Sequence, residues 1–277
     1  PIGTAAEGEL RIVWSANDPV NPDLHTQTID GLGRIRFDVP LNTTGTHPAL
    51  LRQPDDTLRL FWIDQRRVWG AALQDNTLDA GRLLMFDVRR EPGDSLLSLQ
   101  AASDSSRAYL FWQIRRADGT PQVWWSSSPH HVNAWTQPAQ FALTEPAQQT
   151  LNTGYAGPMD VVQAIESGRR PVWWLRPAQM PQPSQQDMLP VAVNIDAEIA
   201  VVLLQAGEIV GYQRVVALKR RLLSAPQLFA ETNGQLHLAW SQPNRQGTSD
   251  IAYTRTRLAL ASVSSASLTS TGSAVMC

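Results

Sequence analysis

Arginine side chains recur just after short apolar runs that end in tryptophan. A guanidinium offers five donors in a planar fork, which suits it to bind carboxylates or phosphates. If the apolar runs are equivalent strands of a repeat, the loops after them share one face of the molecule. We expect the following arginines to form a binding ring on that face: Arg66, Arg67, Arg115, Arg116, Arg176 and Arg245. Asp64, Asp118 and Asp250 lie near them in sequence, so ordinary surface ion pairs are the competing interpretation.

No set of residues in the sequence meets the requirements of a catalytic or metal centre. The five histidines show no metal-ligand spacing, and His130 and His131 are neighbours that would point to opposite faces of a strand. Cys277 is the single cysteine, which excludes an internal disulfide and a cysteine-based zinc site. Nothing in the sequence pairs Tyr155 or Tyr212 with a particular glutamate. We therefore predict no catalytic residue, no bound metal and no cofactor.

Residues 17–19 read Asn-Asp-Pro and resemble the nucleophile motif of five-bladed, invertase-like glycosidases. Those enzymes also need an Arg-Asp-Pro segment and a Glu-Cys acid motif, and this chain has neither. Because an aspartate followed by proline favours a turn, we interpret Asp18 as a turn residue.

Composition narrows the classes of partner. The net charge of −2 argues against a general nucleic-acid binder, which needs excess cations to displace counterions from phosphates. Lys219 is the only lysine among 23 basic residues, a bias expected from a GC-rich genome as well as from carboxylate or phosphate recognition. The best apolar run, residues 195–204, is too short to span a bilayer and contains Asp196 and Glu198. Membrane association would therefore need segments or partners outside this chain.

Five apolar runs that end in tryptophan define an internal repeat. They read LRIVW, LRLFW, AYLFW, PVWW and LHLAW, and their last residues are Trp14, Trp62, Trp112, Trp174 and Trp240. An apolar stretch and a turn precede each run, and a polar turn and another strand-like stretch follow it. A period of roughly 50 to 65 residues with three or four short strands per unit is typical of β-propeller blades. Helices are hard to place, because 19 prolines and 17 glycines interrupt the chain.

We predict an all-β fold, a β-propeller of four-stranded antiparallel blades, over residues 1–260. Five units are clear, and a sixth stays open because the stretch from Trp174 to Trp240 is too long for one blade. In that stretch, residues 199–204 read as the inner strand of a degenerate blade or as an added hairpin. The first unit lacks an upstream strand, so we expect ring closure to borrow one from the C-terminal segment. Residues 261–277 are small and polar and suit a linker or a closing strand.

Residues 224–256 resemble a blade of the bacterial sialidase-like propellers that carry Asp-box repeats. The likeness comprises a strand, an Asn-Gly turn, the apolar run to Trp240, a polar loop and a returning strand. Residues 122–141 resemble the next part of such a blade, where the box reads roughly Ser-x-Asp-x-Gly-x-x-Trp. Ser127 or Ser128 and Trp135 fit that box, while other residues hold its Asp and Gly positions. The resemblance implies the propeller fold.

A sialidase of this family would also need an arginine triad, a tyrosine nucleophile paired with a glutamate, and an aspartate acid. Residues 33–40 do not match the segment that accompanies the first of those arginines, so we do not expect sialidase activity. We predict a non-enzymatic binding or scaffold module of a larger protein or membrane-associated assembly, in an extracytoplasmic location. Its expected partner is a protein, with an acidic surface or a glycan as further candidates.

The alternative is a glycan-active enzyme or glycan-binding protein of the sialidase or glycosidase type. A central pocket lined by two carboxylates about 5–10 Å apart would favour this alternative.

Overall fold

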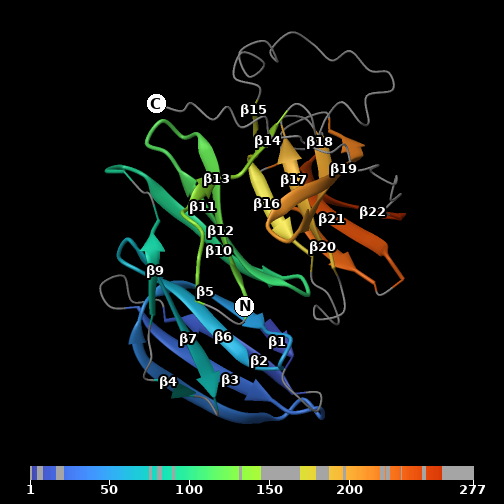
Figure 1. The fold of residues 1–277 in the computed structure, drawn as a ribbon. Helices are drawn as coiled ribbons and strands as arrows, with labels where there is room; N and C mark the ends of the chain where they lie inside the picture. Colours follow the sequence, from blue (N-terminus) through green and yellow to red (C-terminus); the bar gives the residue numbers. More distant parts are fainter. Residues whose placement is uncertain are drawn as a thin grey trace, which may run out of the picture.

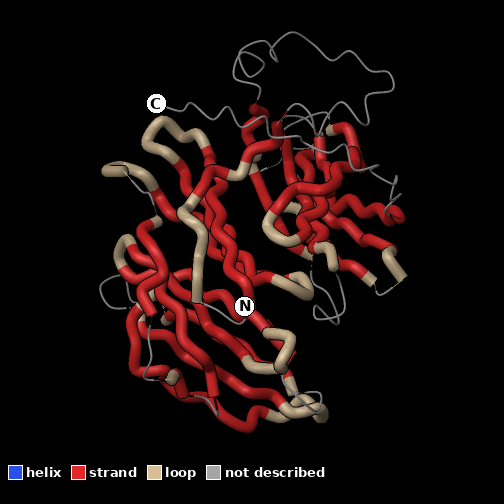
Figure 2. Tube along the Cα trace, in the orientation of Figure 1, coloured by secondary structure: helices blue, strands red, loops and turns tan. Residues whose placement is uncertain are grey.

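The computed structural model describes residues 2–4, 9–16, 22–74, 77–79, 83–88, 91–130, 133–144, 169–178, 187–195, 198–218, 222, 225–231, 233–244 and 248–257. All regular structure in these residues is β-strand, and Figure 2 shows strands and loops with no helix among them. The prediction of an all-β fold is confirmed. None of the described segments forms a helix of the kind that crosses a membrane.

The strands form five main antiparallel sheets that follow one another along the chain. Sheet I contains β1 (Ile2–Thr4), β2 (Leu10–Ser15), β3 (Asp23–Ile29) and β4 (Ile35–Thr44). Sheet II contains β5 (Thr46–Arg52), β6 (Leu58–Asp64), β7 (Arg67–Gln74), β8 (Thr77–Leu78) and β9 (Leu83–Asp87). Sheet III contains β10 (Ser95–Ser103), β11 (Arg107–Arg115), β12 (Pro121–Pro129) and β13 (Ala139–Gln140).

The remaining strands belong to the second half of the chain. A two-stranded sheet joins β14 (Ala142–Thr144) to β15 (Arg169–Pro171). Sheet IV contains β16 (Trp174–Pro177), β17 (Leu189–Ile195), β18 (Glu198–Gln205) and β19 (Glu208–Ala217). Sheet V contains β20 (Gln227–Ala230), β21 (Gln235–Pro243) and β22 (Ser249–Arg257). In sheets I, III and IV four strands pair in chain order, which is the predicted four-stranded antiparallel blade.

Strand β6 shows why the sheets pack face to face. Its sequence LRLFWID is buried at most positions, and side chains alternate between the two faces of a strand. Leu60 and Trp62 join an apolar cluster shared with sheet I, whereas Phe61 and Ile63 join one shared with sheet III. Burial of each such side chain stabilises the fold by about 1.5–3 kcal/mol. A strand of this composition must therefore lie between two sheets.

The same arrangement repeats through the molecule. Apolar clusters fill the spaces between sheets I and II, II and III, III and IV, and IV and V. Figure 1 follows this order from sheets I and II in blue and cyan, through sheet III in green, to sheets IV and V in yellow to red. Within the described residues no buried cluster connects sheet V to sheet I. The fold is a β-propeller arrangement in which five blades are described.

One of the repeated tryptophans does not occupy the predicted position. Trp14, Trp62, Trp112 and Trp240 lie on the second strand of their sheets, but Trp174 begins the first strand of sheet IV. Strands β17 and β18 are almost wholly buried, so they form the centre of that sheet. The strand that carries Trp174 therefore lies at the edge.

Two other details of the predicted repeat also differ. Residues 199–204 lie in β18, the third strand of sheet IV, and form neither the inner strand of a further blade nor an added hairpin. Sheet I has an upstream strand of its own at the N-terminal end, because Ile2, Gly3 and Thr4 of β1 pair with β2. A strand from the C-terminal segment is therefore not needed to supply it.

A close contact at Gly45 defines the boundary between sheets I and II. The Gly45 amide donates to the Pro22 carbonyl at 2.8 Å. A Cβ atom at this position would lie 2.3 Å from Cδ1 of Trp62, far inside van der Waals contact. Only glycine leaves room for the indole here, and Trp62 is held against sheet I.

Candidate functional site

A cleft of about 340 Å³ opens between sheets I and II. Two carboxylates, two indoles and three short polar side chains line it: Asp23, Asn42, Thr43, Thr44, Trp62, Asp64 and Trp69. A volume of this size lies in the range of small-ligand sites in proteins. The cleft is therefore the best candidate for a functional site in the part of the chain that the structure describes.

Strand ends bring the polar side chains to this cleft. Asp23 begins β3 and pairs with Thr44 at the end of β4. On the facing sheet, Asp64 ends β6, and Trp62 pairs with Trp69 across the β6–β7 hairpin. Because cross-strand partners point to the same face of a sheet, Trp69 lies beside Trp62 and near Asp64. The two aspartates thus approach one cleft from separate sheets.

Two local irregularities shape the walls of the cleft. Between the pairs formed by Asp23 and His25, the register of β3 and β4 shifts, and β4 bulges outward. Asn42 lies in this bulge with a φ of 50°, and Gln65 in the β6–β7 turn has a φ of 55°. Non-glycine residues rarely adopt this left-handed conformation, and such positions concentrate at ligand sites.

The side chains of the cleft suit a ligand that has hydroxyl groups and an apolar face. Neither Asp23 nor Asp64 has a side-chain hydrogen bond or ion pair with another described residue, so both carboxylates can accept hydrogen bonds from a ligand. The half-buried ring of Trp69 offers an apolar surface against which a sugar ring can pack. Paired carboxylates are also the groups that glycoside hydrolysis requires.

Sequence reasoning did not identify these residues as a site. Asp64 was expected only to neutralise neighbouring arginines, and Asp23, Asn42 and Trp69 were not singled out. The available signal was the aspartate just after the tryptophan-ended run LRLFW, followed by a second tryptophan.

The described arginines of the predicted ring lie at different kinds of position in the fold. Arg66 lies in the β6–β7 turn and Arg67 begins β7, while Arg115 ends β11 and Arg116 lies in the β11–β12 turn. These two turns are equivalent connections of sheets II and III. Arg176 lies instead within β16, where burial lowers the pKa of its guanidinium. Arg245, the sixth member of the set, lies outside the described residues.

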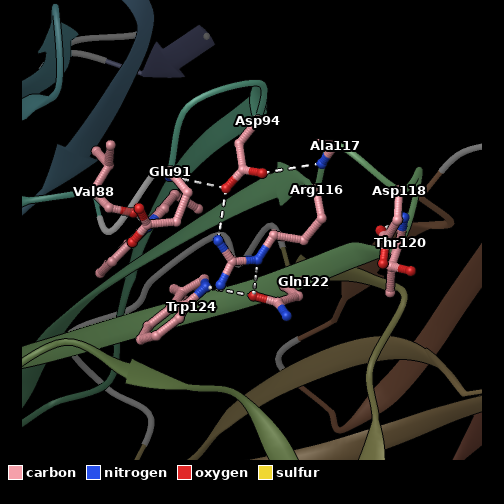
Figure 3. Close-up of polar contacts among 10 residues, drawn as sticks. Val88, Glu91, Asp94, Arg116, Ala117, Asp118, Thr120, Gln122 and Trp124 are labelled. Carbon is pink, nitrogen blue, oxygen red and sulfur yellow. Dashed lines mark hydrogen bonds and ion pairs between the residues drawn. The ribbon is translucent and has the colours of Figure 1, made fainter.

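The charge of Arg116 is neutralised by an ion pair with Asp94. Its Nη1 lies 2.7 Å from Oδ2 of Asp94, and its Nε donates to Gln122 at 3.1 Å. Figure 3 shows Asp94 between this guanidinium and the backbone amides of Glu91 and Ala117. Arg116 therefore belongs to a structural ion pair, as the competing interpretation predicted for surface arginines.

One tyrosine pairs with a glutamate, a contact that nothing in the sequence indicated. The Tyr212 hydroxyl donates to Glu198, and Arg214 lies 3.3 Å from the same carboxylate. This group lies across β18 and β19, and β19 is the last strand in the order of sheet IV. Tyr212 also packs against the apolar cluster between sheets III and IV. It does not line the cleft between sheets I and II.

His237 lies in β21, and its ring lies beside the exposed Tyr253 on one face of sheet V. Its two ring nitrogens each lie 2.6 Å from a partner, the Tyr253 hydroxyl and the Glu231 carboxylate. The hydrogen bond with His237 is the main reason that the pKa of Glu231 lies below its ordinary value. These three side chains satisfy one another on an open surface.

The turn that resembles a decayed Asp box is well ordered by other groups. The Thr136 amide donates to the Ser127 carbonyl at 2.9 Å, and the Ala134 amide donates to Ser128 Oγ at 3.1 Å. The Trp135 ring packs edge-on against Phe61 of sheet II. Serine and threonine oxygens thus replace the missing aspartate, while the tryptophan still plugs the space between two sheets.

The Asn-Asp-Pro segment with Asp18 lies outside the described residues. No cluster of histidine, cysteine, aspartate and glutamate side chains suited to a metal ion occurs in the part that is described.

The sequence matches no protein-family model and no curated protein. The fold is similar to the "Hadza microbial sialidase Hz136", with a TM-score of 0.55, 12% identity, and coverage of 92% of this chain and 55% of that chain. It is also similar to the polysaccharide lyase Uly1, with a TM-score of 0.57, 9% identity, and coverage of 92% of this chain and 56% of that one. A third similar structure, with a TM-score of 0.54, is a protein of unknown function from Dyadobacter fermentans; identity is 8%, and coverage is 92% of this chain and 74% of that chain.

At these identities the likeness shows the fold, and the chain spans little more than half the length of the first two proteins. The predicted non-enzymatic scaffold needs correction. Of the three structures above, the two whose names state an activity are a sialidase and a polysaccharide lyase, so these findings support the glycan-active alternative better than a scaffold. The likeness to sialidases extends to the propeller-type fold and no further.

Proposed function

We propose that this chain is a glycan-active propeller and that it binds its glycan in the cleft between sheets I and II. The observation that carries the proposal is the pair of carboxylates, Asp23 and Asp64, that face one cleft without a partner among the described residues. Trp69 provides the apolar wall for a sugar ring, and Asn42, Thr43 and Thr44 provide amide and hydroxyl groups for its hydroxyls.

The same residues support hydrolysis of a glycosidic bond. In such a reaction one carboxyl group donates its proton to the glycosidic oxygen as the bond to the anomeric carbon breaks. The other carboxylate removes a proton from an attacking water, or attacks the anomeric carbon itself, and water then releases the sugar. Asp23 and Asp64 are the two groups that we assign to these roles.

The test begins with an array of neutral, amino and acidic oligosaccharides, for which binding and release of reducing ends are measured. We expect binding in the array and a loss of roughly tenfold or more in affinity for Trp69→Ala. Asp23→Asn and Asp64→Asn should each reduce any turnover by roughly 10²- to 10⁴-fold, because each removes an acid–base group.

A matched control is available in Trp14→Ala. Trp14 is also half-buried, but it stacks on His25 at 5.5 Å and does not line the cleft. Binding should survive in this variant. A protein that binds no saccharide, or that loses binding equally in both tryptophan variants, would contradict the proposal.

A further inference from the structure

The described residues that line the cleft between sheets I and II carry negative charge and include no cation. Asp23 and Asp64 are the only ionisable groups among them, beside one amide, two indoles and the hydroxyls of Thr43 and Thr44. Recognition of a sugar carboxylate requires a cation or a set of converging donors, for which an arginine fork is best suited. The seven described lining residues include no arginine.

The arginines that strand register places closest to the cleft do not neutralise its two carboxylates. Arg67 pairs with Asp64 at the mouth of the β6–β7 hairpin and lies on the same face of the sheet, but it is exposed and does not line the cleft. Arg11 lies on the inner face of sheet I, but at the other end of β2 from the cleft, where it pairs with Thr28. The β2 residue at the cleft end is Ser15, which pairs with Leu24. Within the described part of the chain, strand register thus places one arginine at the rim of a cleft that two carboxylates line.

Resting on the proposed function, we infer that the cleft selects glycans by charge: it accepts neutral sugars and amino sugars, and it rejects sialic acids and uronic acids. An ammonium group between Asp23 and Asp64 gains two charge-assisted hydrogen bonds. A sugar carboxylate in the same place meets two like charges. Near a protein surface each such interaction changes affinity by roughly tenfold.

The experiment compares five probes of similar length by calorimetry at mildly acidic pH. They are chitosan oligomers, which carry free amines, N-acetylated chitin oligomers, neutral xylan oligomers, and oligogalacturonate, with sialyllactose as a second anion. We expect the affinities to fall in the order amine, neutral, anion. Raising the salt concentration should compress the difference, since screening acts over about 8–10 Å.

Variants separate the origin of the selectivity. Asp23→Asn and Asp64→Asn should each reduce the preference for the amine over the neutral oligomer by roughly tenfold, and the double variant by more. Arg67→Gln removes the rim cation and should widen the gap between neutral and anionic probes. Asp118→Asn is the matched control, because Asp118 lies in the β11–β12 turn of sheet III, outside the cleft. Circular dichroism confirms that each variant is folded.

The outcomes distinguish this inference from the proposal on which it rests. Anionic oligomers that bind as tightly as neutral ones, or selectivity that survives the double aspartate variant, would overturn the charge selection while leaving glycan binding intact. Failure of every probe to bind would overturn the proposed function itself. The predicted order of affinities, lost on removal of both aspartates and kept in Asp118→Asn, would support both.

Discussion

Tyr109 donates its phenolic hydrogen to Oδ2 of Asp104 over 2.5 Å, in the buried space between sheets III and IV. The other oxygen of Asp104 accepts the backbone amides of Ser106 and Arg107 at 2.7 Å each. The Tyr109 oxygen in turn accepts the amide of Gly207, in the β18–β19 turn, at 3.0 Å. This chain of hydrogen bonds connects the hairpins of two neighbouring blades.

Removal of the Tyr109 hydroxyl should destabilise the protein. In Tyr109→Phe, the Gly207 amide loses its partner and Oδ2 of Asp104 keeps only the Ala206 amide, which should cost about 1–3 kcal/mol of unfolding free energy. Urea denaturation followed by tryptophan fluorescence measures this change. Tyr253→Phe is the control, because Tyr253 is exposed on sheet V. Equal stability of the two variants would show that the connection between the blades contributes nothing.

Tyr109 should also make the protein sensitive to alkali. Burial, and then the hydrogen bond and charge of Asp104, raise the pKa of Tyr109 well above its ordinary value of 10.0. Above pH 10 the unfolded chain releases this proton while the folded protein retains it, so the unfolding free energy must fall as the pH rises. Denaturation curves from pH 8 to 11 should show a steeper loss in the native protein than in Tyr109→Phe. Parallel curves would refute this assignment.

Gly45→Ala should disturb both stability and the cleft. The new methyl group would overlap the ring of Trp62, and overpacking of this kind costs about 1–3 kcal/mol. The displaced indole would also narrow the cleft and weaken saccharide binding. A second substitution, Trp62→Phe, makes room for the methyl group, so the double variant should be less destabilised than the sum of the single variants. Additive losses would show that the two residues are not coupled.

The ion pair of Arg116 with Asp94 should contribute stability at neutral pH and lose it in acid. Partial burial works to raise the pKa of Asp94, but hydrogen bonds from Arg116 and from backbone amides outweigh it, and the pKa lies below its ordinary value. A carboxyl group with a lowered pKa in the folded protein stabilises it above the ordinary pKa, and this stabilisation disappears as the pH falls through the folded value.

Arg116→Gln should therefore lower the melting temperature at pH 7, and this effect should become smaller at pH 3, below the ordinary pKa of Asp94 of 3.8. Arg115→Gln is the control, because Arg115 is exposed and has no ion pair with another described residue. We expect Arg115→Gln and Arg67→Gln to leave the melting temperature unchanged at both pH values. A pH-independent effect of Arg116→Gln would mean that the arginine acts through packing of its alkyl chain.

Much of the fold was readable from local patterns. Strand β6, with its run LRLFWID, contains enough apolar side chains for two buried faces, and its repetition around Trp14, Trp112 and Trp240 indicated a stack of similar sheets. Alternation along a strand is a property of the backbone, so it can be recognised in a short segment. The all-β propeller followed from this pattern.

The position of each strand within its sheet was harder to predict from the sequence. Trp174 ends a run that looks like the others, yet it lies on the first strand of sheet IV because β17 and β18 are more completely buried. Competition between strands for the centre of a sheet depends on all of them together. A local pattern therefore misplaces one member of the repeat.

The candidate site depended entirely on tertiary structure. Asp23 and Asp64 are far apart in sequence and belong to different sheets, and neither lies in a recognisable motif. Only the packing of sheet I on sheet II, with Trp62 fitted against Gly45, brings them to one cleft. The sequence by itself determined which segments form strands, because that choice rests on side-chain alternation and burial within each segment. The tertiary structure decided which polar groups meet, because that choice rests on strand register and on contacts between sheets.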